Sequence, residues 1–169
     1  MTSPPLLAVP NFSEGRNPTT IDALAAALEG APAAGTRLLD VHTDLDHHRS
    51  VFTTAGEAAQ LVDAVLRAAR VARDRIDLSA EHADPEGGGQ HPHVGALDVA
   101  PFVYLGPEAR GAACAAALAF ADALAATLAI PAFLYGELTQ DGKHPARARA
   151  DLRLGGLARL QQRMADTGE

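Results

Sequence analysis

The spacing of hydrophobic residues changes repeatedly along this chain, from the two-residue period of strands to the longer period of helices, and this alternation restricts the possible folds most strongly. Short apolar runs predict strands at 6–12, 36–41, 48–56, 96–105 and 130–137. Helical patterns cover 17–29, 57–76, about 107–128 and, as a final short helix, roughly 151–165. We therefore expect an α+β fold in which one domain spans residues 1–169: a ferredoxin-like βαββαβ layer with an added helix and strand, and with the helices on one face of the sheet.

The first two helices show their ends and buried faces in the sequence. Asn17 is suited to cap the first helix and Pro18 to occupy its first position. Gly30 and Pro32 end that helix. The segment 57–76 is strongly amphipathic, and its expected buried face consists of Leu61, Val65, Ala68, Ala72 and Ile76.

Charge and composition exclude several classes of protein. The net charge of -7 argues against a nucleic-acid partner, because such proteins carry a basic surface. The apolar segment 111–131 is rich in alanine and contains Asp122, so we do not expect it to span a membrane. The first ten residues lack the basic segment of a signal peptide. We expect a soluble, cytoplasmic protein that binds a small molecule.

Polar residues concentrate in three loops beside predicted strands, at 11–16, 42–49 and 87–95. Such loops can meet at one edge of a sheet and form a cleft. The expected contributors are Asn11, Glu14, Asp40, His42, Arg49 and His91.

The third loop, "GGGQHPHVG", is the most informative of the three. Glycine is entropically costly and is useful mainly where a chain bends or approaches a ligand closely. Pro92 biases His91 towards an extended conformation, and an imidazole with a pKa of about 6.5 can accept and donate a proton near neutral pH. We expect a proton-transfer site here. An ordinary explanation also exists for two of the polar residues: Asp40 could bond neighbouring backbone, and Arg49 could pair with Asp46 at the surface.

Five segments resemble one family. "VPNFSEGRN", "LLDVHTDLDHHRSVFT", "RIDLS", "HPHVGALDVAPFV" and "IPAFLYGE" occur in order along nearly the whole chain. Together they are similar to the N-terminal subdomain of glutamate formimidoyltransferase, the transferase half of formimidoyltransferase-cyclodeaminase. The resemblance implies a ferredoxin-like subdomain, transfer of a formimidoyl group from N-formimidoyl-glutamate to N5 of tetrahydrofolate as co-substrate, and His91 as the catalytic histidine.

The proposed chemistry suits these residues. A single histidine can take the proton that N5 loses and supply one to the departing nitrogen. A carboxylate would stabilise the cationic amidine, with Asp40, Asp44 and Asp46 as candidates, and Arg49 could hold a substrate carboxylate. The full set of expected substrate-binding residues is Asn11, Glu14, Asp40, His42, Arg49, His93 and Gly95.

The chain departs from the family in its histidines and its length. Gln90 and His93 stand where family members carry Glu and Arg, and His42 and His48 replace an acidic residue and an Asn. The family continues into a second subdomain, and folate lies between the two. We therefore expect a homodimer, formed through an exposed apolar sheet face, or a separately encoded partner that supplies the second subdomain. In a third alternative, the final helix at roughly 151–165 folds over the open face and the chain works alone on a smaller substrate.

Two other classes remain open. A metal site could use His42, Asp44, Asp46, His47 and His48 together with His91 and His93, although their spacing matches no helical His-Glu motif and we predict no metal. A non-catalytic half-enzyme could bind folate or a partner without turnover.

Overall fold

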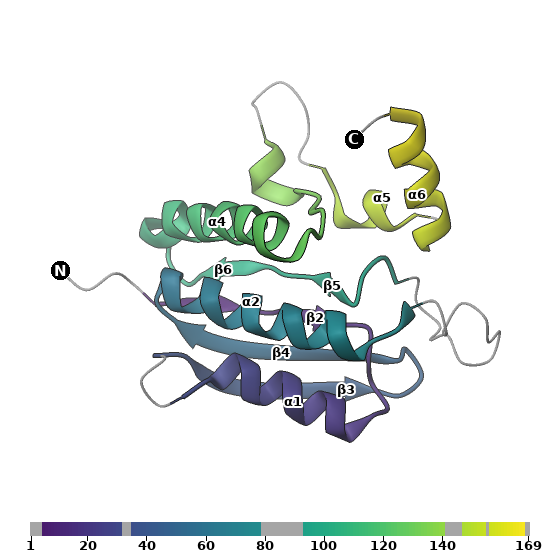
Figure 1. Ribbon diagram of the computed structural model, residues 1–169. Coiled ribbons are helices and arrows are strands. Elements are labelled where there is room, and N and C mark those ends of the chain that lie inside the picture. Colours follow the sequence, from purple (N-terminus) through teal and green to yellow (C-terminus); the bar gives the residue numbers. More distant parts are fainter. Residues whose placement is uncertain (1–4, 32–34, 79–92, 141–146, 155, 168–169) are drawn as a thin grey trace.

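The computed structural model describes residues 5–31, 35–78, 93–140, 147–154 and 156–167, which form an α+β structure (Figure 1). The strands are β1 (Leu6–Ala8), β2 (Asn11–Phe12), β3 (Arg37–Asp44), β4 (Arg49–Gly56), β5 (Leu97–Val99) and β6 (Phe102–Tyr104). The helices are α1 (Pro18–Glu29), α2 (Ala58–Arg75), α4 (Arg110–Leu128), α5 (Arg149–Arg153) and α6 (Gly156–Thr167), with 3-10 turns η2 (Pro107–Ala109) and η3 (Gly136–Thr139).

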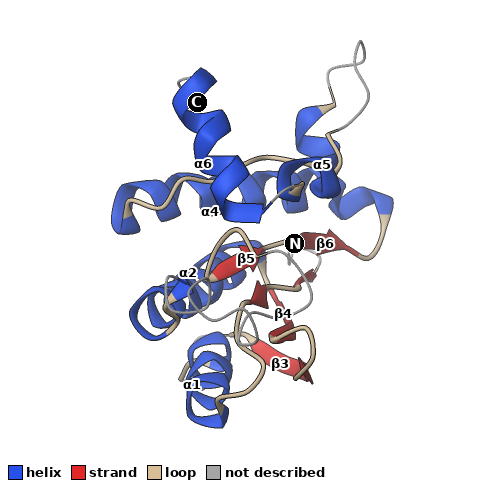
Figure 2. Ribbon diagram, turned by 90° about the vertical axis from the view of Figure 1, so that its right-hand side faces the viewer, coloured by secondary structure: helices blue, strands red, loops and turns tan. Residues whose placement is uncertain are grey.

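All the strands belong to one antiparallel sheet. The order is β5-β2-β4-β1-β6, and β3 pairs with β4 at the edge. The sheet is strongly curled, so its strands fan out when the molecule is viewed from the side (Figure 2). The expected α+β class is therefore confirmed.

Two prolines divide two of the predicted strands. The run 6–12 becomes β1 and β2 around Pro10, and the run 96–105 becomes β5 and β6 around Pro101. Proline has no N–H to donate to the ladder, but its carbonyl still accepts. Phe52 N donates to Pro10 O at 3.0 Å and Val9 N donates to Pro101 O at 3.0 Å, so the chain stays in the sheet at both interruptions.

The first helices form as the sequence predicts. The side chain of Asn17 accepts from Thr19 N at 3.0 Å and from Thr20 N at 3.3 Å, which caps α1. The predicted buried face of segment 57–76 is confirmed, since Leu61, Val65, Ala68 and Ala72 of α2 and the following Ile76 are all buried.

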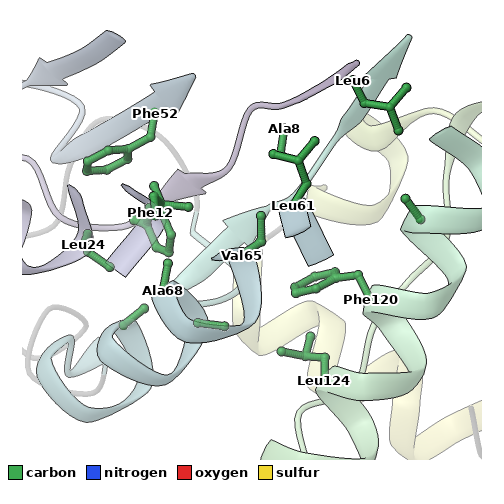
Figure 3. Close-up of a cluster of buried hydrophobic side chains, with 14 of the residues drawn as sticks. Leu6, Ala8, Phe12, Leu24, Phe52, Leu61, Val65, Ala68, Phe120 and Leu124 are labelled. Atoms are coloured by element: carbon green, nitrogen blue, oxygen red, sulfur yellow. The ribbon is translucent and has the colours of Figure 1, made fainter. Parts of the chain in front are cut away.

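The core lies between the sheet and helices α1, α2 and α4 (Figure 3). Phe12 and Phe52 pack edge to face at its centre, with ring centroids 5.5 Å apart. Phe120 of α4 meets Phe102 of β6 at 5.8 Å, so α4 covers the same side of the sheet. Pro107–Leu128 is long and apolar enough to cross a bilayer by length and composition alone, and here its buried side packs against α2 and β6.

Buried and less buried side chains alternate along β4, and the less buried ones define a second face of the sheet, which we call the outer face. Ser50, Phe52 and Thr54 are fully buried towards the helices, so the residues between them point to the opposite side. Cross-strand pairing extends the outer face to neighbouring strands. Its residues are Leu7, Asn11, Arg37, Asp40, His42, Asp44, Arg49, Val51, Thr53, Ala55 and Val103.

Two expectations for the C-terminal third were wrong. Residues 130–135 form no strand and lead instead into the 3-10 turn η3, so the added strand is absent from the described sheet. Pro131 lacks a ladder donor, and Gly136 adopts φ 61. Glu137 accepts from Tyr104 Oη at 3.0 Å and Arg110 Nε at 2.8 Å, and these side-chain bonds fasten the segment to β6 and α4. The single helix expected near 151–165 is two helices, α5 and α6.

Candidate functional site

The β2–α1 loop lies directly against the β3–β4 hairpin because of Gly15. A Cβ at this position would collide with backbone atoms of Asp44 and Arg49. Only glycine allows so close an approach. Arg16 Nε also donates to Leu45 O at 3.0 Å across the same contact. The first two polar loops predicted from the sequence are therefore joined.

Asp44 organises the turn of that hairpin. Its Oδ1 accepts from Asp46 N at 3.0 Å and His47 N at 2.8 Å, and its Oδ2 lies 2.6 Å from His47 Nδ1. The hydrogen bonds from His47 lower the pKa of the Asp44 carboxyl. Both oxygens of this carboxylate are engaged in the turn.

His48 connects the two loops as a neutral ring. It adopts φ 47, and its Nδ1 accepts the backbone N–H of Gly15 at 2.9 Å. Glu14 Oε1 lies 3.5 Å from the same nitrogen, a distance that would suit an ion pair. Burial nevertheless lowers the pKa of His48, with Glu14 opposing this and Arg16 reinforcing it. A nitrogen that accepts an N–H carries no proton, so His48 is neutral and the contact with Glu14 is not an ion pair.

Glu14 is engaged by its own loop. Its Oε1 accepts from Arg16 N at 2.8 Å and Asn17 N at 2.9 Å. The sequence placed Glu14 among the substrate-binding residues; in the structure its side chain is buried and shapes the turn that leads into α1.

Arg49 forms the charged centre of the outer face. Its Nη2 donates to Asp98 Oδ2 at 2.6 Å, and its Nη1 lies 3.5 Å from Asn11 Oδ1. The Asp98 side chain is 0% exposed and that of Arg49 is 12% exposed. The sequence raised Asp46 as the surface partner of Arg49, but the partner is the buried Asp98. Within the described part of the chain, Arg49 Nε is buried without a hydrogen-bond partner.

Asp98 also holds the segment that enters β5. Its Oδ1 accepts from Val94 N at 2.9 Å. One buried carboxylate therefore links the hairpin residue Arg49 to the stretch 93–98. Sequence reasoning missed Asp98, although an acidic residue inside the apolar run "ALDVAPFV" was a usable signal.

His93 and Ser13 meet at the same junction. His93 Nδ1 lies 2.6 Å from Ser13 Oγ, which also contacts Gly95 O at 2.8 Å, while Ser13 N donates to Ala96 O at 3.0 Å. His93 is buried, and Gly95 contributes its carbonyl. Ser13 was also missed by sequence reasoning.

Asp40 and His42 lie farther along the outer face and are exposed. His42 pairs with Val51, which pairs in turn with Asn11, so the three side chains form one row across β3, β4 and β2. Strand spacing of about 4.8 Å puts His42 roughly 10 Å from Asn11. Asp40 pairs with Thr53 in the next outward-facing position of β4.

The predicted catalytic residue, His91, lies outside the described residues, as does Gln90. In the described portion, no three His, Cys, Asp or Glu side chains are grouped so that they could hold a metal ion. His47, one of the residues of the alternative metal site, contacts Asp44 within the turn.

A cavity of about 680 Å³ lies on the helical side of the sheet. It is lined mainly by apolar side chains of α2, α4, segment 130–138 and β5. Leu160 and Gln161 of α6 also line it, which places α6 on the helical side rather than over the outer face. Val94, Gly95 and Asp98 line it as well, whereas Asn11, His42 and Arg49 lie on the outer face.

Comparison with known proteins gives a consistent result. The chain matches the family model "Formiminotransferase domain, N-terminal subdomain" over residues 6–169. It is 41% identical over 129 residues to formimidoyltransferase-cyclodeaminase of Sus scrofa, covering 76% of this chain and 22% of that protein. It is 36% identical over 127 residues to glutamate formimidoyltransferase of Streptococcus pyogenes, covering 75% of this chain and 40% of that protein. The chain therefore spans between about a fifth and two fifths of the length of these curated relatives.

Proposed function

Since the chain belongs to the formiminotransferase family and corresponds to its N-terminal subdomain, we propose that it takes part in formimidoyl transfer between an N-formimidoyl amino acid and tetrahydrofolate. The family match over residues 6–169 is the observation that carries this proposal. The relatives named as glutamate formimidoyltransferases suggest glutamate as the donor's amino acid.

The outer face is the proposed binding surface. One end carries Asn11, Arg49 and His42, and the other carries Leu7, Ala55 and Val103, with the exposed Arg37 at its edge beside Ala55. A ligand with a flat aromatic part and a charged part, as in tetrahydrofolate, suits such a division. Segment 93–98, which directly follows His91 and Pro92, borders the polar end through the Arg49–Asp98 contact.

His91 is the proposed general base and acid. It takes the proton that N5 of tetrahydrofolate loses as it attacks the amidine carbon, and it returns a proton to the departing nitrogen of the donor. The exposed carboxylate of Asp40 is the proposed partner of the amidinium. Arg49 Nη2 is already paired with Asp98 and Nε is buried, so the nitrogen proposed to hold a substrate carboxylate is Nη1.

The finer fold assignment is also a proposal. β1 and β2 can be counted as one strand interrupted by proline, and so can β5 and β6. The sheet then has four strands in the order β5/β6, β1/β2, β4, β3, which is fourth, first, third, second along the chain. Every adjacent pair is antiparallel. This order supports a ferredoxin-like layer.

We further propose that a second sheet covers the outer face and completes the pocket. The described helices lie on the other side of the sheet, and Val103 on the outer face is 37% exposed. A second copy of this chain is the first candidate, and a separately encoded chain with the remaining subdomain is the other. Because the chain spans only part of its relatives, binding of folate without turnover is a second candidate function.

A transfer assay tests the function. Purified chain is mixed with tetrahydrofolate and N-formimidoyl-glutamate, and formation of the one-carbon folate is followed. His91→Ala is expected to reduce the rate by about 100-fold or more, as loss of a general base does, with the fold retained. His47→Ala, a turn variant, is the control and should keep the rate. Wild-type turnover by His91→Ala would reject His91 as the base, and folate binding without turnover would favour the binding function.

A further inference from the structure

The edge of the sheet at β3 carries backbone groups that can pair with a further strand. β3 is hydrogen-bonded to β4 on one side, and no described strand lies on its other side (Figure 1). In an antiparallel ladder every second residue directs its N–H and C=O away from its neighbour, so about half of the eight residues of β3 face outwards. Such an edge can accept a strand from another chain.

Exposed apolar side chains concentrate at the same edge. Of the seven large hydrophobic side chains that are exposed in the described residues, Leu39, Val41 and Leu45 lie on β3 or in the turn that follows it. Val41 pairs with the fully buried Phe52 and so points to the helical side of the sheet, yet it is 37% exposed. A strand added beside β3 would shield Val41 and Leu39 from water.

The outer-face side chains of β3 suit a second copy of the chain as the added strand. In sequence order they are Arg37, Asp40, His42 and Asp44. In a two-fold symmetric antiparallel pair, each residue meets a residue of the partner on the same face of the sheet. When Val41 lies on the symmetry axis, Asp40 lies opposite the partner's His42, and His42 lies opposite the partner's Asp40.

A bulge extends this match along the strand. β3 contains one extra residue between Leu38 and Asp40 where it pairs with β4, so the pairing moves by one residue beyond the bulge. Arg37 then lies opposite the partner's Asp44 on the outer face. All four outer-face residues of β3 therefore meet a side chain of complementary charge type.

Registers that are one residue away bring like charges together. With Asp40 on the axis, its carboxylate faces the same carboxylate of the partner. With His42 on the axis, Asp40 faces the partner's Asp44. Like charges directly opposite each other destabilise a strand pair, so the charge pattern selects the register centred on Val41.

We propose that β3 pairs with β3 of a second copy in antiparallel orientation, centred on Val41, so that the two sheets become continuous. The Asp40 carboxylate accepts a hydrogen bond from the imidazole of the partner's His42, which has an N–H in either charge state. Two eight-residue strands meet over only about 27 Å. So small an interface holds chains together weakly, and we expect association at about 0.5 mM rather than at micromolar concentration. This contact uses the edge of the sheet and depends neither on formimidoyl transfer nor on what covers the outer face.

Sedimentation equilibrium of the Val103→Glu chain tests the proposal, because this substitution removes association through the outer face. At about 0.5 mM the mass should rise from 17.5 kDa towards twice that value. The wild-type chain should likewise exceed its own micromolar mass. A Val103→Glu chain that stays at 17.5 kDa, together with a wild-type mass that does not change with concentration, would overturn the proposal.

A charge exchange in the same background tests the register. Asp40→Lys puts a cation opposite the partner's His42, and His42→Asp puts two carboxylates opposite each other, so each alone should restore the monomer mass. The two substitutions combined restore opposite charges and should restore association. Asp63→Lys, at an exposed position of α2, makes the same change in net charge as Asp40→Lys and should leave association intact. A combined variant that associates no better than the single ones would exclude the Val41-centred pairing.

Discussion

At the scale of single residues, three histidines are each held by a different hydrogen-bond partner. His48 uses Nδ1 as an acceptor from Gly15 and is kept neutral by burial, so it is part of the framework. His93 is buried, and its Nδ1 lies 2.6 Å from Ser13 Oγ, so it joins the β2–α1 loop to the segment that enters β5. His47 contacts Asp44 in the turn. The sequence shows only that histidines are present, and backbone placement assigns these roles.

Gly15 provides a test of the contact between the first two loops. Gly15→Ala places a methyl group against the backbone of Asp44 and Arg49, and neither can yield without moving the hairpin. We expect a loss of about 1–3 kcal/mol in the free energy of unfolding, measured by urea denaturation.

Gly111 is the matched control for this prediction. It lies in α4 with nothing within 4 Å of an added Cβ. Gly111→Ala should stabilise the chain by about 0.5–1 kcal/mol, because alanine favours the helix. Equal effects of the two substitutions would show that the close approach at Gly15 does not matter.

Several site residues were accessible from sequence and others were not. Asn11, Arg49 and His93 were predicted, because polar residues beside predicted strands tend to meet at a sheet edge. Ser13 and Asp98 were missed, because their importance depends on contacts with residues far away in sequence. A buried ion pair between β4 and β5 cannot be inferred from spacing alone.

At the scale of elements, helix patterns predicted more than strand patterns did. α1 and α2 end within a residue or two of their predicted ends, because caps and amphipathic spacing are local. The strands around Pro10 and Pro101 were predicted as continuous and are each divided. The apolar run 130–137 resembled a strand, but its side-chain bonds to β6 and α4 hold it outside the ladder. Hydrophobic spacing does not report such tertiary contacts.

The pair Arg49–Asp98 joins β4 to β5, and we expect its removal to affect the whole sheet. Asp98→Asn leaves a nearly buried guanidinium without its anion, which should cost about 3–5 kcal/mol in the free energy of unfolding. Arg49→Met combined with Asp98→Asn should recover much of that loss. Additive losses in the double variant would mean that the two side chains are not energetically coupled.

At the scale of the whole molecule, the sheet has a helical face with the core and an outer face with the candidate site. We expect the outer face to carry a second sheet, so light scattering at micromolar concentration should give twice the 17.5 kDa chain mass. Val103→Glu on the outer face should yield a monomer.

Leu118 on α4 provides the control for the Val103→Glu substitution. It is 45% exposed, comparable to 37% for Val103, but lies on a helix that covers the opposite side of the sheet. Leu118→Glu should leave the mass unchanged. A wild-type mass near 17.5 kDa would reject the homodimer and favour a separate partner.

Binding of folate on the outer face is tested most directly by an NMR titration. The stable analogue 5-formyltetrahydrofolate is added to the ¹⁵N-labelled chain, and backbone amide shifts are mapped. We expect saturable shifts in β2 and β4, centred on Asn11, Arg49 and Val51, with little change in α4 or in segment 130–138, which line the cavity on the helical side. Absence of binding at millimolar ligand, or shifts confined to the cavity between α2 and α4, would contradict it.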